Sequence, residues 1–232
     1  MRLSRTLPVA GLLVGLVLAG CSNTPGINPV SREQITEALR AVTGQADAGT
    51  RLQPTPGFPG LDPALIAGRS DPLTGAYLAR TQGLAALSMV SSARGLAHWR
   101  TSDDIGLTLT GPGLLVATRG LGDDLHAADV RQTAALIAAG QAGSAQRRHV
   151  YLDGTFAQER MTLTCTVQPV GPETLILNGR SLPTLRFDER CEGAGDPVVN
   201  SYWRDARGPL IRQSSQWVGP RTGMVHLQRL VE

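Results

Sequence analysis

Thr162-Leu163-Thr164-Cys165-Thr166-Val167 is the stretch that most clearly decides the fold of this chain. Threonine and valine are β-branched and favour extended strands. The stretch ends the segment 156–167, which follows 148–152 across Asp153-Gly154, a dipeptide typical of tight hairpins. Asn178-Gly179 separates 175–177 from 182–187 in the same way. We therefore predict two consecutive β-hairpins in this part of the chain.

Shorter strand candidates extend outward from this centre in both directions. They cover 76–80, 84–91, 95–100, 105–109, 114–118, 198–203, 209–217 and 224–231. Gly111-Pro112-Gly113 turns the chain between two of them, which predicts a further hairpin with one buried face. Aromatic residues make up only 4%, against 27 Gly and 15 Pro, a composition that suits many turns and short strands.

Two helices interrupt the strand pattern. The segment 130–139 has Asp129 as a predicted N-cap and Gly140 as its end. A short N-terminal helix is predicted after Ser31, which forms a capping box with Gln34. This helix either binds a partner or packs on its own domain, and the second hypothesis is favoured.

The first 21 residues have the features of a bacterial lipoprotein signal. Arg2 and Arg5 precede the apolar stretch 9–19, which is too short to span a bilayer, and Leu18-Ala19-Gly20-Cys21 follows as a lipobox. We predict a signal peptide at 1–20, a lipidated tether at 21–30 with lipid on Cys21, and a single β domain at 31–232. Ser22 favours the outer membrane, by resemblance to enterobacterial sorting rules.

The charge pattern argues against nucleic-acid binding. The net charge is +3, and every basic side chain is arginine because the chain has no lysine. The arginines are scattered, without a basic run or interleaved aromatic residues.

The two remaining cysteines, Cys165 and Cys191, predict a disulfide, since an exported protein meets an oxidising compartment. The chain-entropy argument assigns about 3–4 kcal/mol to a loop of this order. A redox or metal pair is the alternative, but Cys-x-x-Cys spacing and nearby histidines are missing. No cofactor or metal is expected.

The sequence contains no recognised catalytic motif. Four single histidines are expected to be ordinary strand or loop residues, namely His98, His126, His149 and His226. Three acidic pairs offer glycosidase-like carboxylates, but such pairs are common in turns: Asp103-Asp104, Asp123-Asp124 and Asp188-Glu189. Core packing is favoured over sugar stacking for Trp99, Trp203 and Trp217.

Several motifs together resemble the YjbF/GfcB family of group 4 capsule and exopolysaccharide lipoproteins. They are Trp99-Arg100-Thr101, the segment 114–125, Tyr151-Leu152-Asp153-Gly154, Asn200-Ser201-Tyr202-Trp203, the turn 205–208 and the segment 216–220. The resemblance spans roughly 35–230, in order and behind a lipobox. The sequence departs from the family at Asp103-Asp104 and Gly111-Pro112-Gly113, where only turn geometry is affected.

The resemblance implies a mainly β fold, with a large antiparallel sheet curled into a sandwich or partly open barrel and a few helices. It also implies an outer-membrane lipoprotein that faces the periplasm and serves polysaccharide export. It implies no catalytic residues. The motif residues with candidate roles in contacting a partner or glycan are Arg119, Asp123, Asp124, Tyr202, Trp203 and Trp217.

The sequence leaves three hypotheses for the function. The first is a non-enzymatic accessory factor that contacts polysaccharide-export proteins and is held at the membrane through Cys21. The second is a carrier that holds an acyl chain or glycan in a cavity of about 300–1,000 Å³. The third is a glycan-modifying enzyme with two carboxylates about 5–10 Å apart in a cleft.

A Cys21→Ser variant tests the anchor. Without the sulfur that carries the diacylglyceryl group, the protein should move from the membrane fraction to the soluble fraction. Fractionation and immunoblotting measure this directly. A variant that stays with the membranes would contradict the lipobox interpretation.

Overall fold

The structure is a computed structural model that describes residues 58–59, 64, 66–152 and 157–232. Four predictions lie outside these residues: the signal peptide and lipobox, the tether, the helix after Ser31 and the Asp153-Gly154 turn. The described residues belong to one compact unit. None of the helices in this described part is long and apolar enough to cross a membrane.

Twelve strands and one helix make up the described chain. In chain order they are β1 (Leu73–Leu78), β2 (Gly83–Ala93), β3 (Leu96–Arg100), β4 (Gly106–Thr110), β5 (Leu115–Arg119), β6 (Leu125–Asp129), α2 (Arg131–Ala139), β7 (Gly143–Leu152), β8 (Gln158–Leu177), β9 (Arg180–Glu192), β10 (Val198–Asp205), β11 (Ile211–Gly219) and β12 (Gly223–Val231).

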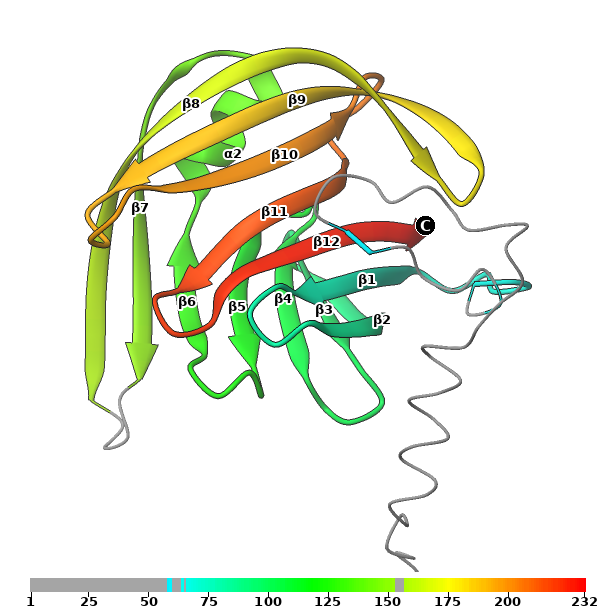
Figure 1. The fold of residues 1–232 in the computed structure, drawn as a ribbon, viewed down its shortest axis with the longest axis horizontal. Coiled ribbons are helices and arrows are strands. Elements are labelled where there is room, and N and C mark those ends of the chain that lie inside the picture. The colour runs from blue at the N-terminus through cyan, green and yellow to red at the C-terminus, as the bar shows by residue number, and fades with distance from the viewer. Residues whose placement is uncertain (1–57, 60–63, 65, 153–156) are drawn as a thin grey trace, which may run out of the picture. The chain divides into compact units, whose positions relative to one another are not determined.

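The strands form a single antiparallel sheet in the order β5-β4-β3-β2-β1-β12-β11-β10-β9-β8-β7-β6. The sheet curls until its two edge strands, β5 and β6, approach each other, so that it nearly closes into a barrel (Figure 1). This confirms the predicted mainly β fold with a curled antiparallel sheet, and it decides for the partly open barrel over the sandwich.

Side chains rather than a strand ladder close the seam between β5 and β6. At one end, the Leu125 backbone N–H donates to Thr118 Oγ1 over 2.9 Å. Gln216 of β11 fixes the start of β5, because it accepts from the Leu115 N–H and donates to the Gly113 carbonyl. Gly113 has φ +123, and a Cβ there would lie 3.3 Å from Ile211 Cβ, so the turn before β5 approaches β11 closely because it carries glycine.

The hydrophobic core fills the barrel interior. Alternate residues of β8 point inward, with Leu163, Cys165 and Val167 buried and the threonines between them exposed. Apolar residues from strands all around the sheet complete this core, including Trp99 and Trp217. The stretch 162–167 therefore supplies one wall of the interior.

The two hairpins are longer than predicted. β8 runs without a break for 20 residues, through Pro169 and Pro172, where the sequence pattern suggested an interruption. Beyond Val167 its ladder with β7 ends, so this part of β8 is an edge, where proline is tolerated. Asn178 (φ 53) and Gly179 (φ 73) form the predicted tight turn. β6 and the first half of β7 were not predicted.

Helix α2 corrects part of the capping prediction. It begins at Arg131, with Val130 at the N-cap and no side-chain cap, although Asp129 accepts from the Arg131 N–H. Gln132, in the first turn, accepts from the Gln146 N–H of β7. Gly140 ends the helix in the left-handed conformation as predicted.

The disulfide prediction is confirmed. Cys165 of β8 and Cys191 of β9 are directly opposite in the strand register, and their sulfur atoms are bonded. Both residues are fully buried. The bond therefore ties the central hairpin to itself within the core.

Candidate functional site

A buried polar network lies inside the barrel around the carboxylate of Glu189. Arg147 Nη1 donates to Glu189 Oε2 over 2.7 Å, and both side chains are at most 1% exposed. Tyr202 and Asn200 each donate to the same oxygen over 2.8 Å. Thr133 of α2 donates to Oε1 over 2.5 Å. Four donors from β7, β10 and α2 thus converge on one side chain of β9.

This environment keeps the carboxylate charged. Burial alone would raise the pKa of Glu189, but the Arg147 guanidinium and the three other donors hold it below the ordinary value of 4.5. A buried ion pair is costly to desolvate, and the four hydrogen bonds to the carboxylate offset part of that cost, although Arg147 Nε is buried without a partner among the described residues. The arrangement holds α2 against the sheet, so its role is to fix the barrel rather than to react.

A second buried polar group, formed by His149 and Tyr151, lies further along β7. His149 Nδ1 lies 2.9 Å from the Tyr151 hydroxyl, which donates to the Val218 carbonyl. The hydroxyl has one hydrogen, so the His149 ring must supply the other as the neutral Nδ1–H tautomer. Burial and the charge on Arg147 lower the pKa of His149 to about 3. The imidazole stacks on Trp217 at 5.7 Å between centroids.

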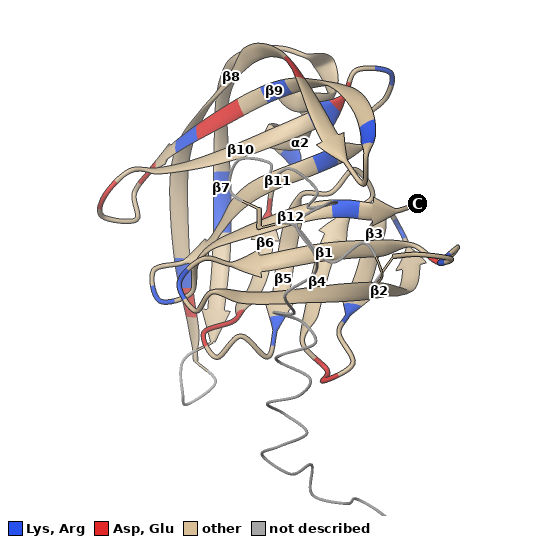
Figure 2. Cartoon of the chain, turned by 45° about the vertical axis from the view of Figure 1, so that its right-hand side comes forward, with Lys and Arg blue, Asp and Glu red and all other residues tan. Residues whose placement is uncertain are grey.

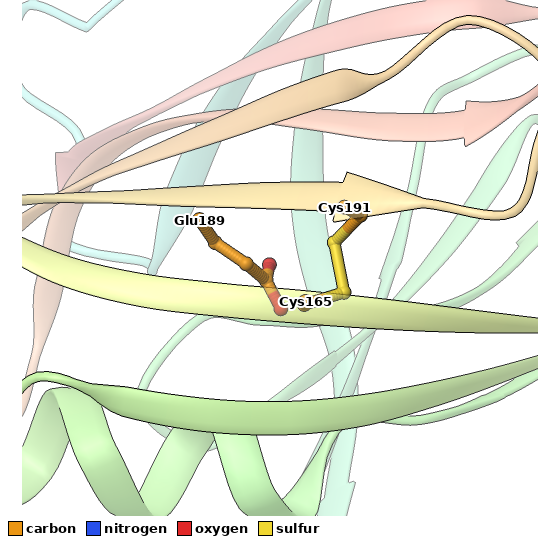
Figure 3. Close-up of side chains that lie close together, drawn as sticks. All are labelled: Cys165, Glu189 and Cys191. Carbon is orange, nitrogen blue, oxygen red and sulfur yellow. A yellow bond between two sulfur atoms is a disulfide. The ribbon is translucent and has the colours of Figure 1, made fainter.

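Cys165, Glu189 and Cys191 are the only His, Cys, Asp or Glu side chains among the described residues that gather closely enough to hold a metal ion. Figure 3 shows them side by side, with the two sulfur atoms joined. Sulfur in a disulfide is not a thiolate, and the Glu189 oxygens already accept four hydrogen bonds. This group offers no free ligand to a metal.

The barrel interior leaves little room for a ligand. An apolar cavity of about 220 Å³ lies near one mouth, lined by inward residues such as Leu78, Leu87 and Val225. It is smaller than the 300 Å³ or so that a bound chain or glycan requires. The packed interior therefore counts against a carrier.

A larger groove of about 570 Å³ crosses the outer face of the sheet from β2 to β7 and is named here the outer groove. Its lining includes His98, Arg100, Thr108, Arg119, His126 and Leu152. Gly106 lies at its centre, paired with Arg100 on one side and Arg119 on the other. The missing side chain at Gly106 leaves space between two guanidinium groups.

The predicted contact residues near this groove differ in whether their charged groups are free to contact a partner. Arg119 is exposed, and no described carboxylate pairs with it. Asp124 accepts from Thr118, from the Gly120 N–H and from the Leu121 N–H, so it shapes its own loop. Asp123 pairs with Arg221 over 2.8 Å.

The other three predicted contact residues are buried. Tyr202, Trp203 and Trp217 are 0%, 3% and 7% exposed. Tyr202 belongs to the Glu189 network, and Trp203 lies under Arg186, whose guanidinium carbon is 5.2 Å from the ring centroid. These side chains therefore offer little surface to a partner or glycan, and Trp203 and Trp217, like Trp99, are packed in buried clusters.

The acidic pairs do not form a glycosidase centre. Asp188 and Glu189 point to opposite faces of β9, since Glu189 is inward and Asp188 pairs with Arg186 on the outside. Among the described residues, Asp205 and Glu232 do line one cleft, but both are bound to Arg212. Burial raises the pKa of Asp205, but the Arg207 N–H and Arg212 lower it by more, so the pKa lies below its ordinary value. A general acid would need a raised pKa.

The fold and the sealed interior define a barrel protein whose accessible grooves lie outside the sheet. The sequence matches the family described as "Group 4 capsule polysaccharide lipoprotein gfcB, YjbF" over residues 66–230, and the chain therefore belongs to this family. Among curated proteins, no match was found.

One solved structure shows the same fold. A hypothetical lipoprotein, YmcC from Escherichia coli K12, superposes with a TM-score of 0.64 at 17% identity, covering 89% of this chain and 98% of its own. A putative lipoprotein from Parabacteroides distasonis and a putative exported protein with a YmcC-like fold from Bacteroides fragilis are more distant, with TM-scores of 0.28 and 0.27 and identities of 6% and 9%. They cover 70% and 69% of this chain, and 95% and 93% of their own.

Sequence reasoning missed the centre of the network. Arg147 and Thr133 had no predicted role, and Glu189 was considered only as part of an acidic pair, although Asn200, Tyr202 and Trp217 lie in motifs that carried the family resemblance. Strand alternation was the available signal, because it would have placed Arg147 on the same inward face as Ala145 and His149.

Glu189→Gln should destabilise the fold strongly. The substitution leaves the Arg147 charge buried and uncompensated, which typically costs about 3–5 kcal/mol. Urea unfolding followed by circular dichroism measures the free energy of unfolding. Glu192→Gln is the matched control, because Glu192 faces Arg190 in an exposed pair at 3.9 Å and should cost less than about 1 kcal/mol. Equal losses in both variants would refute the role of the network.

His149 should make stability fall in mild acid. Its pKa is about 3 in the folded protein against 6.5 ordinarily, so the unfolded chain takes up the proton first as the pH drops below 6.5. Stability from this group is complete above pH 6.5 and declines toward pH 3, by up to about 1.4 kcal/mol per pH unit. A His149→Phe variant should lose that slope between pH 6.5 and 5, and a wild-type slope in the variant would exclude this cause.

Proposed function

We propose that this protein is a non-enzymatic accessory factor for the secretion or assembly of a capsule or exopolysaccharide. The observation that carries the proposal is the match to the capsule polysaccharide lipoprotein family over residues 66–230. The site chemistry agrees with it, because the carboxylates of Glu189, Asp205 and Asp124 are engaged in the buried network, an ion pair and a turn rather than paired as acid and base.

The outer groove is the contact surface that fits this role best. It has a volume of about 570 Å³, and it combines exposed apolar side chains, Val90 and Leu152, with the cation of Arg119. Arg100 contributes less charge, since it pairs with Asp104 over 3.4 Å. A partner with an acidic and partly apolar surface would complement this groove.

The proposed location is the periplasmic face of the outer membrane. The lipobox and Ser22 support this location, and the family description supports a lipoprotein. Lipid on Cys21 would hold the barrel close to the export machinery. Tethering of this kind raises the local concentration of the partner without any additional contact.

Charge reversal in the outer groove tests the proposal in cells. In a strain that lacks the native gene, Arg119→Glu should restore much less surface polysaccharide than the wild-type protein, because the reversed charge repels an acidic partner. Immunoblotting checks that both proteins accumulate equally, and extracted surface polysaccharide is the readout.

Arg190→Glu is the matched control, since Arg190 is an exposed arginine on β9 outside the groove. It should restore wild-type levels. If deletion of the gene leaves surface polysaccharide unchanged, the proposed function is wrong. If both arginine variants complement fully, the groove is not the contact surface.

A further inference from the structure

Two further hollows lie next to each other at the opposite end of the barrel from the β5–β6 loop. They have volumes of about 460 and 450 Å³ and share Arg180, Leu182, Arg212 and Glu232, so they form one continuous feature, named here the hairpin cleft. The tip of the β8–β9 hairpin overhangs the ends of β11 and β12 there, near the C-terminus (Figure 1).

Specific contacts hold this hairpin in place. Asn178 Nδ2, in the turn, donates to the Leu230 carbonyl of β12 over 3.0 Å. Leu175, Leu177 and Leu182 pack with Trp203 into a small apolar cluster on the outer side of the sheet. The cleft is therefore a built feature with an apolar wall and not a gap beside a loose loop.

Arginine dominates the polar lining of the hairpin cleft. Basic segments gather where β9, β10, β11 and β12 end near the C-terminus (Figure 2). Four arginines line the two hollows, Arg180, Arg207, Arg212 and Arg229, against the two carboxylates of Asp205 and Glu232. Both carboxylates contact Arg212. The cleft consequently has an excess of positive charge.

Arg229 is one of the cations in the cleft that lack a carboxylate partner among the described residues. No described carboxylate forms an ion pair with it, and its guanidinium lies 4.5 Å from the centre of the Trp99 ring. Burial and the neighbouring charge of Arg212 lower the pKa of Arg229 to about 10. A guanidinium at this distance from the ring makes a cation–π contact, and its planar N–H groups match a carboxylate through two parallel hydrogen bonds.

We infer that the hairpin cleft binds a carboxylate group of an acidic glycan, with Arg229 and Arg180 as the ligands of the anion. The planar guanidinium matches a carboxylate in bidentate geometry. Leu177 and Leu182 offer an apolar wall to the C–H face of the sugar ring. The choice of a glycan, though not of an anion, rests on the proposed function.

Isothermal titration of the lipidated full-length protein in detergent tests this inference. Tetragalacturonate is the probe, and maltotetraose is its neutral counterpart. Wild type should bind tetragalacturonate and not maltotetraose, with affinity that falls as salt rises. Arg229→Gln and Arg180→Ala should each weaken binding by about tenfold or more, as expected for loss of a charge-assisted hydrogen bond.

Arg190→Ala is the matched control and should bind like wild type. Arg180 is exposed, so Arg180→Ala keeps the test valid if Arg229→Gln fails to fold. No binding of tetragalacturonate, equal binding of maltotetraose, or sodium sulfate binding as tightly as tetragalacturonate would each overturn the inference. These outcomes are separate from the proposed function, whose failure appears as unchanged surface polysaccharide in the deletion strain.

Discussion

The ion pair between Arg147 and Glu189 is the interaction on which the rest of the described structure depends. It links β7 and β9 across β8 and, through Thr133, draws α2 against the sheet. Asn200 extends the same network to the backbone of β11 through the Trp217 N–H. Because a charge left alone in this interior is so unfavourable, the network permits only one register for these strands.

A sealed polar core has a consequence for function. The interior is occupied by the network, the disulfide and packed apolar side chains, so a ligand or partner has to meet the outside of the barrel. Two hollows are open to such contacts: the outer groove around Arg119, and the hairpin cleft, where Arg180 is exposed and Arg229 lies over the Trp99 ring. Both carry arginine without a carboxylate partner, which suits contact with acidic polymers or acidic protein surfaces.

Local sequence patterns predicted much of the fold, whereas contacts between residues far apart in the chain could not be predicted from them. Asn178-Gly179 predicted its turn because two consecutive positive φ values restrict the residue types there. The ion pair could not be predicted in this way, since its members are 42 positions apart and each has a charged neighbour, Arg148 or Asp188. Strand alternation can indicate which neighbour faces inward, but it does not say which charge on another strand that residue meets. The outer groove likewise arises only once β2 to β7 lie side by side.

The most direct test of this account asks whether the barrel interior is filled. Native mass spectrometry of the Cys21→Ser protein purified from cells measures whether a lipid or glycan is carried inside. The account predicts the mass of the polypeptide alone, because the described interior offers only about 220 Å³ near one mouth. A stoichiometric co-purified lipid that resists exchange would contradict it and would favour a carrier.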